Sequence, residues 1–384
     1  MKLLTHEIGS LAKPSFRVKS LRKIKLSDSD IEEAKTWANF LEIEEKKELI
    51  DLLKKREKFN NEEKERIIYF SSLLAIRLLE KAGLDLVYDG EQHRIEMYEH
   101  PIKNIGGFEF KGHVRSFNNK FYKRASCIDK PTLLRNYHDE EFLRIKSIAK
   151  KEIKIPITGA YTLVDWSYDE YFLKEIKPGE ENIKDKKREA RKEFLISMAK
   201  NIIYPVIKSL LDKGAKYIQI DEPAATTKKD EIDLFIMTMR ESIGDLKNKA
   251  FFSTHICFSD YSLLFPRIKE LEGILNEIHF EYANRDTREL GTKGDKRKGY
   301  EILEKFKDTK FIVGLGVIDV HTDFIEPPEL VRDRILYALD IIGDPERIYI
   351  APDCGLRTRT WKVAFEKLKN MVEGKTLAEK EARI

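Results

Sequence analysis

Cysteine is scarce in this sequence, and no long apolar run is present. The three cysteines, Cys127, Cys257 and Cys354, are too few for a disulfide scaffold in 384 residues and favour a reducing compartment. No apolar stretch approaches the roughly 20 residues that a membrane-spanning helix needs. The first residues, Met1–Glu7, are too short and too polar for a signal peptide. We therefore expect a cytoplasmic protein with no membrane partner.

Charge of one sign is not in excess either. The 71 Lys and Arg residues nearly cancel the 67 Asp and Glu residues, and the formal net charge is only +4. The two signs are interspersed along the chain, whereas a nucleic-acid binder more often has a concentrated basic face. Nucleic acid is therefore not an expected partner.

Eight short runs rich in β-branched residues or Phe are predicted to be strands, with helical stretches between them. Eight β–α alternations favour a (β/α)8 TIM barrel, an α/β fold with a parallel core sheet. An open doubly wound sheet is the alternative, but the sequence has no G-x-G-x-x-G of the kind that its dinucleotide-binding form needs. The predicted strands are Leu3–Gly9, Leu84–Tyr88, Ile153–Thr158, Lys216–Ile220, Phe251–Ile256, Glu277–Glu281, Phe311–Gly316 and Ile348–Ala351.

Two of the predicted helices have well-marked ends. Apolar residues share one helical face over Leu195–Leu210, where Pro205 is expected to kink the helix and Gly214 to end it. A second apolar face covers Leu330–Ile342, and Gly343 follows as a stop.

The chain is longer than the roughly 250 residues of a typical (β/α)8 barrel, and two stretches hold the excess. Residues 27–82, after the first strand, have the pattern of charged amphipathic helices. Residues 106–128, after the second strand, have hairpin character, with Asn118-Asn119 as the turn. We expect one catalytic barrel over residues 1–384 that includes both insertions.

Side chains able to bind a metal lie at or just after the ends of three of the predicted strands. His255 and Cys257 lie at the end of the fifth strand, Glu281 ends the sixth, and Cys354 follows the eighth. Residues two apart in an extended segment project to the same side, and the carboxyl ends of barrel strands share one mouth. The four side chains could therefore meet at one ion. An imidazole, two thiolates and a carboxylate suit tetrahedral zinc.

The charge of this ligand set favours thiol chemistry. Two thiolates and one carboxylate outweigh the two positive charges of zinc, and an anionic site of this kind activates water poorly. It suits a bound substrate thiol, whose pKa the metal lowers. Exchange of one ligand, Glu281, would open a position for that thiol. A zinc hydrolase is disfavoured on the same ground.

Structural explanations compete with a zinc site. A single Cys at a strand end is usually a small buried hydrophobe, and a single His is usually a core or surface residue. Structural zinc is a further alternative, but such sites usually use Cys-x-x-Cys knuckles, and the sequence has none. Cys127 lies in the hairpin insertion with no partner nearby in the sequence, and we expect it to be structural.

Eight short segments together form a more specific pattern than any one of them. They are Glu7–Ser10, Asp89–Glu91, Thr158–Ser167, Gln219–Pro223, His255–Cys257, Phe280–Glu281, Gly316–His321 and Pro352–Arg359. In this order they resemble the catalytic C-terminal half of cobalamin-independent methionine synthase, in its short, archaeal-type core form. The resemblance implies a (β/α)8 barrel, the four zinc ligands named above, and a methyltransferase that makes methionine from homocysteine.

The resemblance also implies a homocysteine site. It assigns substrate contacts to Ile8, Ser10, Glu91 and Asp221. The two carboxylates would hold the ammonium group, and the backbone around Ser10 would hold the carboxylate. For Asp221 and Glu222, a helix N-cap is the alternative interpretation.

The same resemblance implies roles at the methyl-donor side. His321 would be the general acid that protonates the leaving nitrogen of the donor, and Asp319 would orient it or raise its pKa. Trp166 would stack on the pterin ring of a folate-type donor. An exposed loop for Asp319 and His321, and a packing role for Trp166, are the structural alternatives.

The segments that would contact the donor depart from the family's pattern. The family's Ser-Phe-Pro-Gln is here Ser10–Lys13, and the hairpin segment is Lys120–Ala125 in place of Arg-Cys-Val-x-Pro-Pro. The family's long form carries an N-terminal barrel that helps to bind the donor, whereas this sequence begins almost at the first matching segment. A methyl-folate, a methyl-pterin and a methyl-corrinoid protein all stay open as donor. A partner protein could dock on residues 27–82, although we expect those helices to cover the side of the barrel.

Two other functions stay open. One is a zinc methyltransferase that acts on another thiol, such as coenzyme M, with a corrinoid donor. Glu91 and Asp221 argue against it, because only an amino-acid substrate needs an ammonium pocket. The other is a non-catalytic, zinc-stabilised barrel that serves as a subunit.

Overall fold

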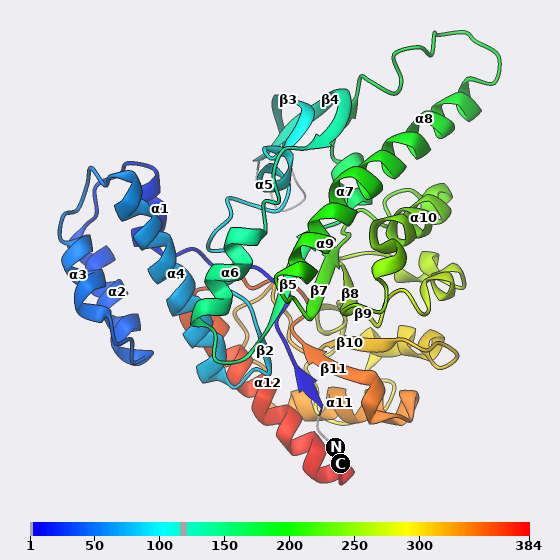
Figure 1. Cartoon of the computed structure of the whole chain (residues 1–384). Helices are drawn as coiled ribbons and strands as arrows, with labels where there is room; N and C mark the ends of the chain where they lie inside the picture. Colours follow the sequence, from blue (N-terminus) through cyan, green and yellow to red (C-terminus); the bar gives the residue numbers. More distant parts are fainter. Residues whose placement is uncertain (1–2, 116–120) are drawn as a thin grey trace.

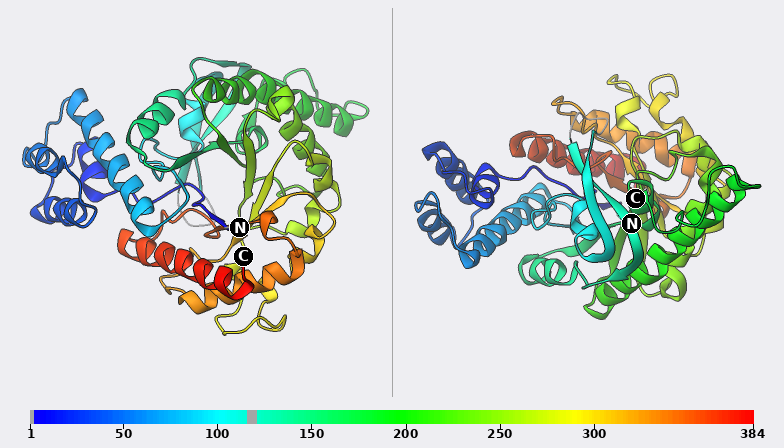
Figure 2. Two further views of the ribbon diagram at one scale, coloured as in Figure 1. Left: turned by 60° about the horizontal axis from the view of Figure 1, so that its bottom comes forward. Right: turned by 90° about the horizontal axis from the view of Figure 1, so that it is seen from above.

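Eight parallel strands form the central sheet of this protein, whose computed structural model describes residues 3–115 and 121–384. The strands are β1 (Leu4–Thr5), β2 (Leu86–Val87), β5 (Glu152–Thr158), β7 (Tyr217–Asp221), β8 (Phe251–Ile256), β9 (Glu277–Phe280), β10 (Ile312–Gly316) and β11 (Ile348–Ala351). Their order in the sheet is β1-β11-β10-β9-β8-β7-β5-β2, and helices surround the curled sheet (Figures 1 and 2). The predicted (β/α)8 barrel is confirmed.

The two edge strands are shorter than predicted. Each keeps only two residues, and beyond them the chain leaves the sheet. The amide of Asp85 donates to the carbonyl of Thr5, and the amide of Leu11 donates to the carbonyl of Gly90. The two edges therefore meet through loop hydrogen bonds, and the residues after each strand are free to line the mouth.

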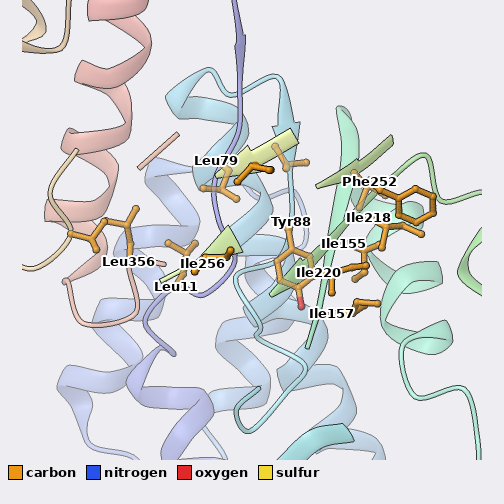
Figure 3. Close-up of a cluster of buried hydrophobic side chains, with 14 of the residues drawn as sticks. Leu11, Leu79, Tyr88, Ile155, Ile157, Ile218, Ile220, Phe252, Ile256 and Leu356 are labelled. Atoms are coloured by element: carbon orange, nitrogen blue, oxygen red, sulfur yellow. The ribbon is translucent and has the colours of Figure 1, made fainter. Parts of the chain in front are cut away.

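Side chains alternate between the outside and the inside of the barrel. Ile155, Ile157, Ile218 and Ile220 pack outward in a buried apolar cluster (Figure 3). Lys154 and Gln219 alternate with these isoleucines along β5 and β7 and lie on the other face, inside the barrel, where the ammonium of Lys154 donates to the Gln219 side chain. Bulky branched residues usually fill such a barrel. Here the apolar core lies between sheet and helices, and the barrel interior is a polar network.

The predicted helical insertion contains one helix that belongs to the barrel and others that stand outside it. It contains α2 (Asp28–Phe40), α3 (Lys46–Leu53) and α4 (Asn61–Ala82), and α1 (Ser15–Leu21) precedes it. The last of these, α4, packs on β2, α6 (Asp139–Ile148) and α12 (Trp361–Ala382), so it occupies the place of the first barrel helix. The other three stand outside the ring of helices (Figure 2).

Capping and aromatic contacts fix the inserted helices. Capping boxes begin α2 at Ser27 and α4 at Asn60, and Gly83 ends α4 with a φ of 95°. The Trp37 ring of α2 lies edge-on to Trp361 of α12, with ring centroids 5.4 Å apart. These contacts attach the insertion to the side of the barrel.

The predicted hairpin insertion is longer than residues 106–128. It consists of antiparallel β3 (Ile105–Arg115) and β4 (Phe121–Leu133), and β4 also pairs in parallel with β6 (Tyr168–Asp169). The pairing with β6 extends the insertion into a three-stranded sheet. The predicted turn at Asn118-Asn119 lies outside the described residues.

The helix predicted around Pro205 is interrupted before that residue. It runs as α8 (Ile183–Met198), a π-helical turn η1 (Ala199–Ile203) and α9 (Tyr204–Asp212), and Gly214 follows with a φ of 89°. Proline lacks an amide proton, so the regular ladder breaks there and a wider turn accommodates it. By length and composition this stretch could span a membrane, but just over half of it is buried inside the protein, as in a core helix.

The other helices complete the ring. The predicted stop at Gly343 is confirmed, since α11 (Pro328–Ile342) ends there and Gly343 has a φ of 73°. After β8 and β9 the connections contain 3-10 segments, among them η5 (Arg267–Leu271) and η7 (Lys298–Phe306). The remaining α-helices are α5 (Glu99–Ile102), α7 (Ala160–Asp165) and α10 (Ile232–Ile243).

Candidate metal centre and substrate site

Four side chains from three strand ends meet at the mouth of the barrel. His255 is the fifth residue of β8 and Cys257 follows that strand, Glu281 follows β9, and Cys354 lies three residues after β11. One ligand atom from each lies within 4.8 Å of those of the other three. The structure therefore brings together the four residues that the sequence proposed as ligands.

The distances and free atoms in this group fit a tetrahedral metal. The two sulfur atoms, Sγ of Cys257 and of Cys354, are 3.5 Å apart. Two thiolates that share a zinc ion at about 2.3 Å would be roughly 3.8 Å apart. Nε2 of His255 is buried and has no hydrogen-bond partner of regular geometry among the described residues, and the side chain that interacts most strongly with His255 is Cys354, another proposed ligand. A buried polar atom without a partner is costly, and a metal ion would satisfy it.

Hydrogen bonds join the two thiols and Glu281. Sγ of Cys257 donates to Oε1 of Glu281 at 3.0 Å. The hydrogen bond from Cys257 lowers the pKa of Cys354 to about 5, and the charge of His255 adds to this effect. Burial alone would raise the pKa of Glu281, but hydrogen bonds from His321 and Cys257 outweigh it and lower that pKa. The group therefore holds a thiolate and a carboxylate, the charge states that ligands need.

Asp353 holds the loop that carries Glu281, a role that sequence reasoning missed. Its buried carboxylate accepts hydrogen bonds from the amides of Tyr282 and Ala283 at 2.9 Å and of Asn284 at 2.6 Å. Asn284 in turn donates its side-chain amide to Glu281 at 2.5 Å. The Asp353-Cys354 pair therefore connects the β11 end to the β9 end. Only its place beside Cys354 in the sequence could have indicated this.

His321 faces the same group from the loop after β10. Its Nε2 lies 3.2 Å from Oε2 of Glu281, and the side chain is 43 % exposed. This hydrogen bond raises the pKa of His321 to about 9. The carboxylate of Asp319 accepts from the His321 backbone amide at 2.8 Å. Asp319 thus holds the backbone of the loop and adds only a weaker charge effect, while Glu281 orients the ring.

A cluster of acidic groups lies beside the ligands. Asp221 ends β7 and accepts from the Gln219 amide at 2.7 Å. Burial raises its pKa to about 7, and the nearby charge of Glu91 adds to this rise. Glu7 is close to both, and burial raises its pKa to about 8. Glu91 itself has a φ of 60°, a strained value that is common at functional sites. Clustered acids of this kind favour a cationic ligand.

The segment around Ser10 lies against the loop after β11, which carries Cys354 and Gly355. Gly355 packs so closely on it that an added methyl group would lie 3.0 Å from the Ser10 amide nitrogen. The carbonyl of Ile8 accepts from the Gln219 side chain at 2.6 Å. Lys13, which sequence reasoning did not assign, is half-buried near Glu91, and burial lowers its pKa to about 8.

Glu222 accepts hydrogen bonds from the first turn of a helix, whereas Asp221 does not. The Glu222 carboxylate accepts from the amides of Tyr161 at 3.1 Å and Thr162 at 2.7 Å, at the first turn of α7. Gly159 is required beside it, because a side-chain carbon there would overlap this carboxylate. Glu222 is therefore not the N-cap residue of a following helix, as the alternative interpretation had it, but accepts from the first turn of α7, while its neighbour Asp221 lies at the mouth.

Trp166 lies at the end of α7, with its ring near Tyr98. It is half-buried, and its ring centroid lies 6.2 Å from that of Tyr98. Tyr98 bonds through its hydroxyl to Ser167 and to the amide of Ala125 on β4. The Trp166 ring therefore lies next to the hairpin, and its part in donor binding stays a prediction.

A second cluster, His100, His138 and Glu141, also has ligand atoms within 4.8 Å of one another. The carboxylate of Glu141 is already occupied, because it accepts from Arg94 at 2.9 Å, from His138 at 2.8 Å and from Tyr88. The buried guanidinium of Arg94 neutralises it. This arrangement is a structural ion pair that joins the loop after β2 to α6.

Comparison with known proteins supports one family. Residues 42–376 match the family described as cobalamin-independent synthase, catalytic domain. The methionine synthase of Thermoplasma acidophilum is 36 % identical over 380 residues, 96 % of each chain. That of Pyrococcus horikoshii is 35 % identical over 312 residues, 81 % of this chain and 82 % of the relative.

Solved structures share the fold. A B12-independent methionine synthase from Shewanella sp. W3-18-1, solved in complex with selenomethionine, aligns over 100 % of this chain and 99 % of its own with a TM-score of 0.74 and 22 % identity. A methyltransferase from Methanosarcina mazei aligns over 98 % and 94 % of the two chains, with a TM-score of 0.57 and 12 % identity.

Proposed function

The chain belongs to the cobalamin-independent methionine synthase family and is a methyltransferase, and from this premise we propose that it methylates the thiol of homocysteine at a zinc site. The zinc ligands would be His255, Cys257, Glu281 and Cys354. The convergence of these four ligand atoms within 4.8 Å carries the proposal.

The chemistry of the donor set supports zinc and a thiol substrate. Two sulfur atoms and one imidazole nitrogen are ligands that zinc prefers over harder cations such as magnesium. When bound, zinc lowers the pKa of a substrate thiol and so favours its thiolate. Glu281 is the ligand most readily exchanged, because His321 and Asn284 already offer it other hydrogen bonds.

The acidic cluster supports an amino-acid substrate. Glu91 and Asp221 would hold the ammonium group, and the backbone around Ser10 and Ile8 would hold the carboxylate. Asp221 is close enough to His255 and Glu91 for their charges to shift its pKa, so the ammonium site adjoins the proposed metal site. A substrate spanning the two sites would have a thiol and an ammonium group, as homocysteine has. Coenzyme M has no ammonium group to place there.

His321 would supply a proton to the leaving group of the methyl donor. The hydrogen bond to Glu281 keeps the ring protonated at neutral pH, and its partial exposure lets a bulky donor reach it. Trp166 and the hairpin β3–β4 would contact the donor from the other side. A methyl-folate, a methyl-pterin and a methyl-corrinoid protein are the donors to test.

We also propose that residues 1–384 act as one catalytic unit and that the enzyme works in the cytoplasm. The helices of residues 27–82 pack on the barrel through α4 and α12, which supports a shared core.

The test combines a thiol panel with a donor panel. The zinc-loaded protein is assayed with homocysteine, cysteine and coenzyme M, each with methyl-folate, methyl-pterin and methylcobalamin. Methionine formation from homocysteine with at least one donor is the expected result, and methylation of coenzyme M alone would contradict the proposal. In a matched pair, Asp221→Asn should weaken homocysteine binding while zinc content stays unchanged, whereas Cys354→Ser should lose both.

A further inference from the structure

His255 and His279 form a buried imidazole pair that the function described so far does not use. The Nδ1 atom of His255 lies 2.8 Å from Nδ1 of His279, and both residues are at most 4 % exposed. At this distance one nitrogen donates a proton and the other accepts it. The position of that single proton decides what the far side of the His255 ring can do.

Only one of the two arrangements is compatible with a metal. If Nδ1 of His255 donates, Nε2 has a free lone pair, and this buried atom has no hydrogen-bond partner of regular geometry among the described residues. If Nδ1 of His255 accepts, a neutral ring must carry its proton on Nε2 and cannot bind a metal through that atom. The hydrogen bond that His279 makes with Nδ1 of His255 therefore decides whether Nε2 of His255 can bind a metal.

We propose that His279 is a positioning residue, which accepts the Nδ1 proton of His255 and so fixes the tautomer and orientation that present Nε2 to the metal. The inference rests on the proposed metal site. Metal-binding histidines generally donate their second nitrogen to a carboxylate, a backbone carbonyl or water. A second imidazole takes that place in this protein.

Neighbouring strands hold the His279 ring in a close-fitting position. A side-chain carbon at Gly314 on β10 would lie 2.7 Å from Cβ and 2.9 Å from Cδ2 of His279, so glycine leaves the space that this ring occupies. The carbonyl of Pro352 on the β11 side faces the same ring and interacts with it. The ring is thus enclosed between two strands, which is what a positioning residue requires.

A second polar layer lies below the pair. The His6 ring packs edge-on against His279, with ring centroids 6.1 Å apart. Nε2 of His6 lies 3.0 Å from Oε1 of Glu277, and Nδ1 lies 2.8 Å from Nζ of Lys154. His6 therefore shares the burial and polarity of His279, and its side-chain partners among the described residues are Lys154 and Glu277 rather than a proposed metal ligand. This makes it a matched control.

Two polar substitutions of His279 separate the proposed role from a general packing role. In His279→Asn the side-chain oxygen can reach the place of Nδ1 and accept from His255. In His279→Gln the amide reaches instead toward the place of Nε2 and Pro352, and the position facing His255 has no acceptor. Zinc affinity is measured by competition with a chromophoric chelator, the cobalt(II)-substituted protein is examined for its d–d absorption bands, and the metal-free proteins are melted.

We expect His279→Gln to weaken zinc binding by about 10–100-fold and to change the cobalt spectrum, while His279→Asn retains most of the affinity. His6→Asn should bind zinc like the unmodified protein. Unchanged affinity in His279→Gln, or equal losses in all three variants that follow their melting temperatures, would overturn the inference. Zinc binding without turnover of homocysteine would instead contradict the proposed function and leave this inference standing.

Discussion

Two groups of side chains in this protein have the spacing of a metal site, and they differ in what already occupies their ligand atoms. At the barrel mouth the proposed ligands bond mainly to one another, and Nε2 of His255 has no partner of regular geometry among the described residues. Beside β2 the carboxylate of Glu141 is filled by Arg94, His138 and Tyr88. Proximity is the same in both groups, but in the second group the carboxylate is already occupied, and only the first group contains thiols.

Charge separates the two groups further. In the mouth group the basic side chains beside the Cys354 thiolate and the Glu281 carboxylate are the imidazoles of His255 and His321, and an imidazole can lose its proton when a cation binds. In the second group the buried guanidinium of Arg94 balances Glu141, so a divalent ion there would meet a like charge in a medium of low dielectric constant. Spacing alone is therefore insufficient evidence for a metal site. Hydrogen-bond occupancy and net charge must agree with it.

The largest expected effect is the loss of metal from the mouth group when one of its ligands is replaced. We expect Cys354→Ser to reduce zinc affinity by more than the roughly 10–100-fold that loss of a supporting residue costs, because a serine hydroxyl is a poor zinc ligand. Zinc content after dialysis against a chelator measures this loss. The control, His100→Asn in the second group, should keep its zinc, and depletion of zinc there would contradict the comparison.

In the second group the expected loss is of stability. Glu141→Gln leaves Arg94 buried without its counter-ion, which should lower the free energy of unfolding by about 3–5 kcal/mol. Urea denaturation measures the change, and zinc content should not alter. Glu65→Gln is the control, since this exposed partner of Arg144 should contribute less than about 1 kcal/mol. A variant at Glu141 that lost zinc but kept its stability would make the second group a metal site.

Acid should weaken the second group in a defined pH range. Burial lowers the pKa of His100 to about 3 and that of His138 to about 4, so both rings stay neutral in the folded protein. Near pH 6.5 the unfolded chain begins to take up protons that the folded protein does not, and stability falls as the pH drops toward 4. Each ring contributes at most about 1.4 kcal/mol per pH unit.

Removing one ring tests this expectation. His100→Asn should show a shallower loss of melting temperature between pH 7 and pH 4 than the unmodified protein. His113→Asn, at an exposed position on the hairpin, should follow the unmodified protein. Parallel curves for His100→Asn and the unmodified protein would show that His100 is not held neutral.

The smallest effect concerns the cysteine that lies outside both groups. Sγ of the buried Cys127 donates to the carbonyl of Asp129 at 3.2 Å, and burial raises its pKa to about 12. A hydroxyl can make the same hydrogen bond, so Cys127→Ser should cost only about 1 kcal/mol and leave zinc content unchanged. Thermal melts and metal analysis check both points. Loss of zinc would show that this thiol matters to the mouth group.

Hydrophobic pattern alone predicted the barrel. All eight strands were found from runs of apolar residues, and β8 (Phe251–Ile256) and β11 (Ile348–Ala351) have the predicted bounds. The strands β1 and β2 are shorter than predicted, because residues beyond them pair in loops rather than in the sheet. The sequence also indicated the ligand types, since His255 and Cys257 alternate along one extended segment.

The tertiary structure alone decided the supporting contacts. His279 has the sequence context of an ordinary strand residue, and it becomes a partner of His255 only because β9 lies beside β8 and because Gly314 on β10 leaves room for its ring. Asp353 could not be linked to the loop after β9, nor Glu222 to the first turn of α7, without coordinates. The periodicity of apolar side chains is a local property and can be recognised from neighbouring residues in the sequence. Side-chain contacts between strands depend on which strands lie next to each other, and only the folded chain determines that.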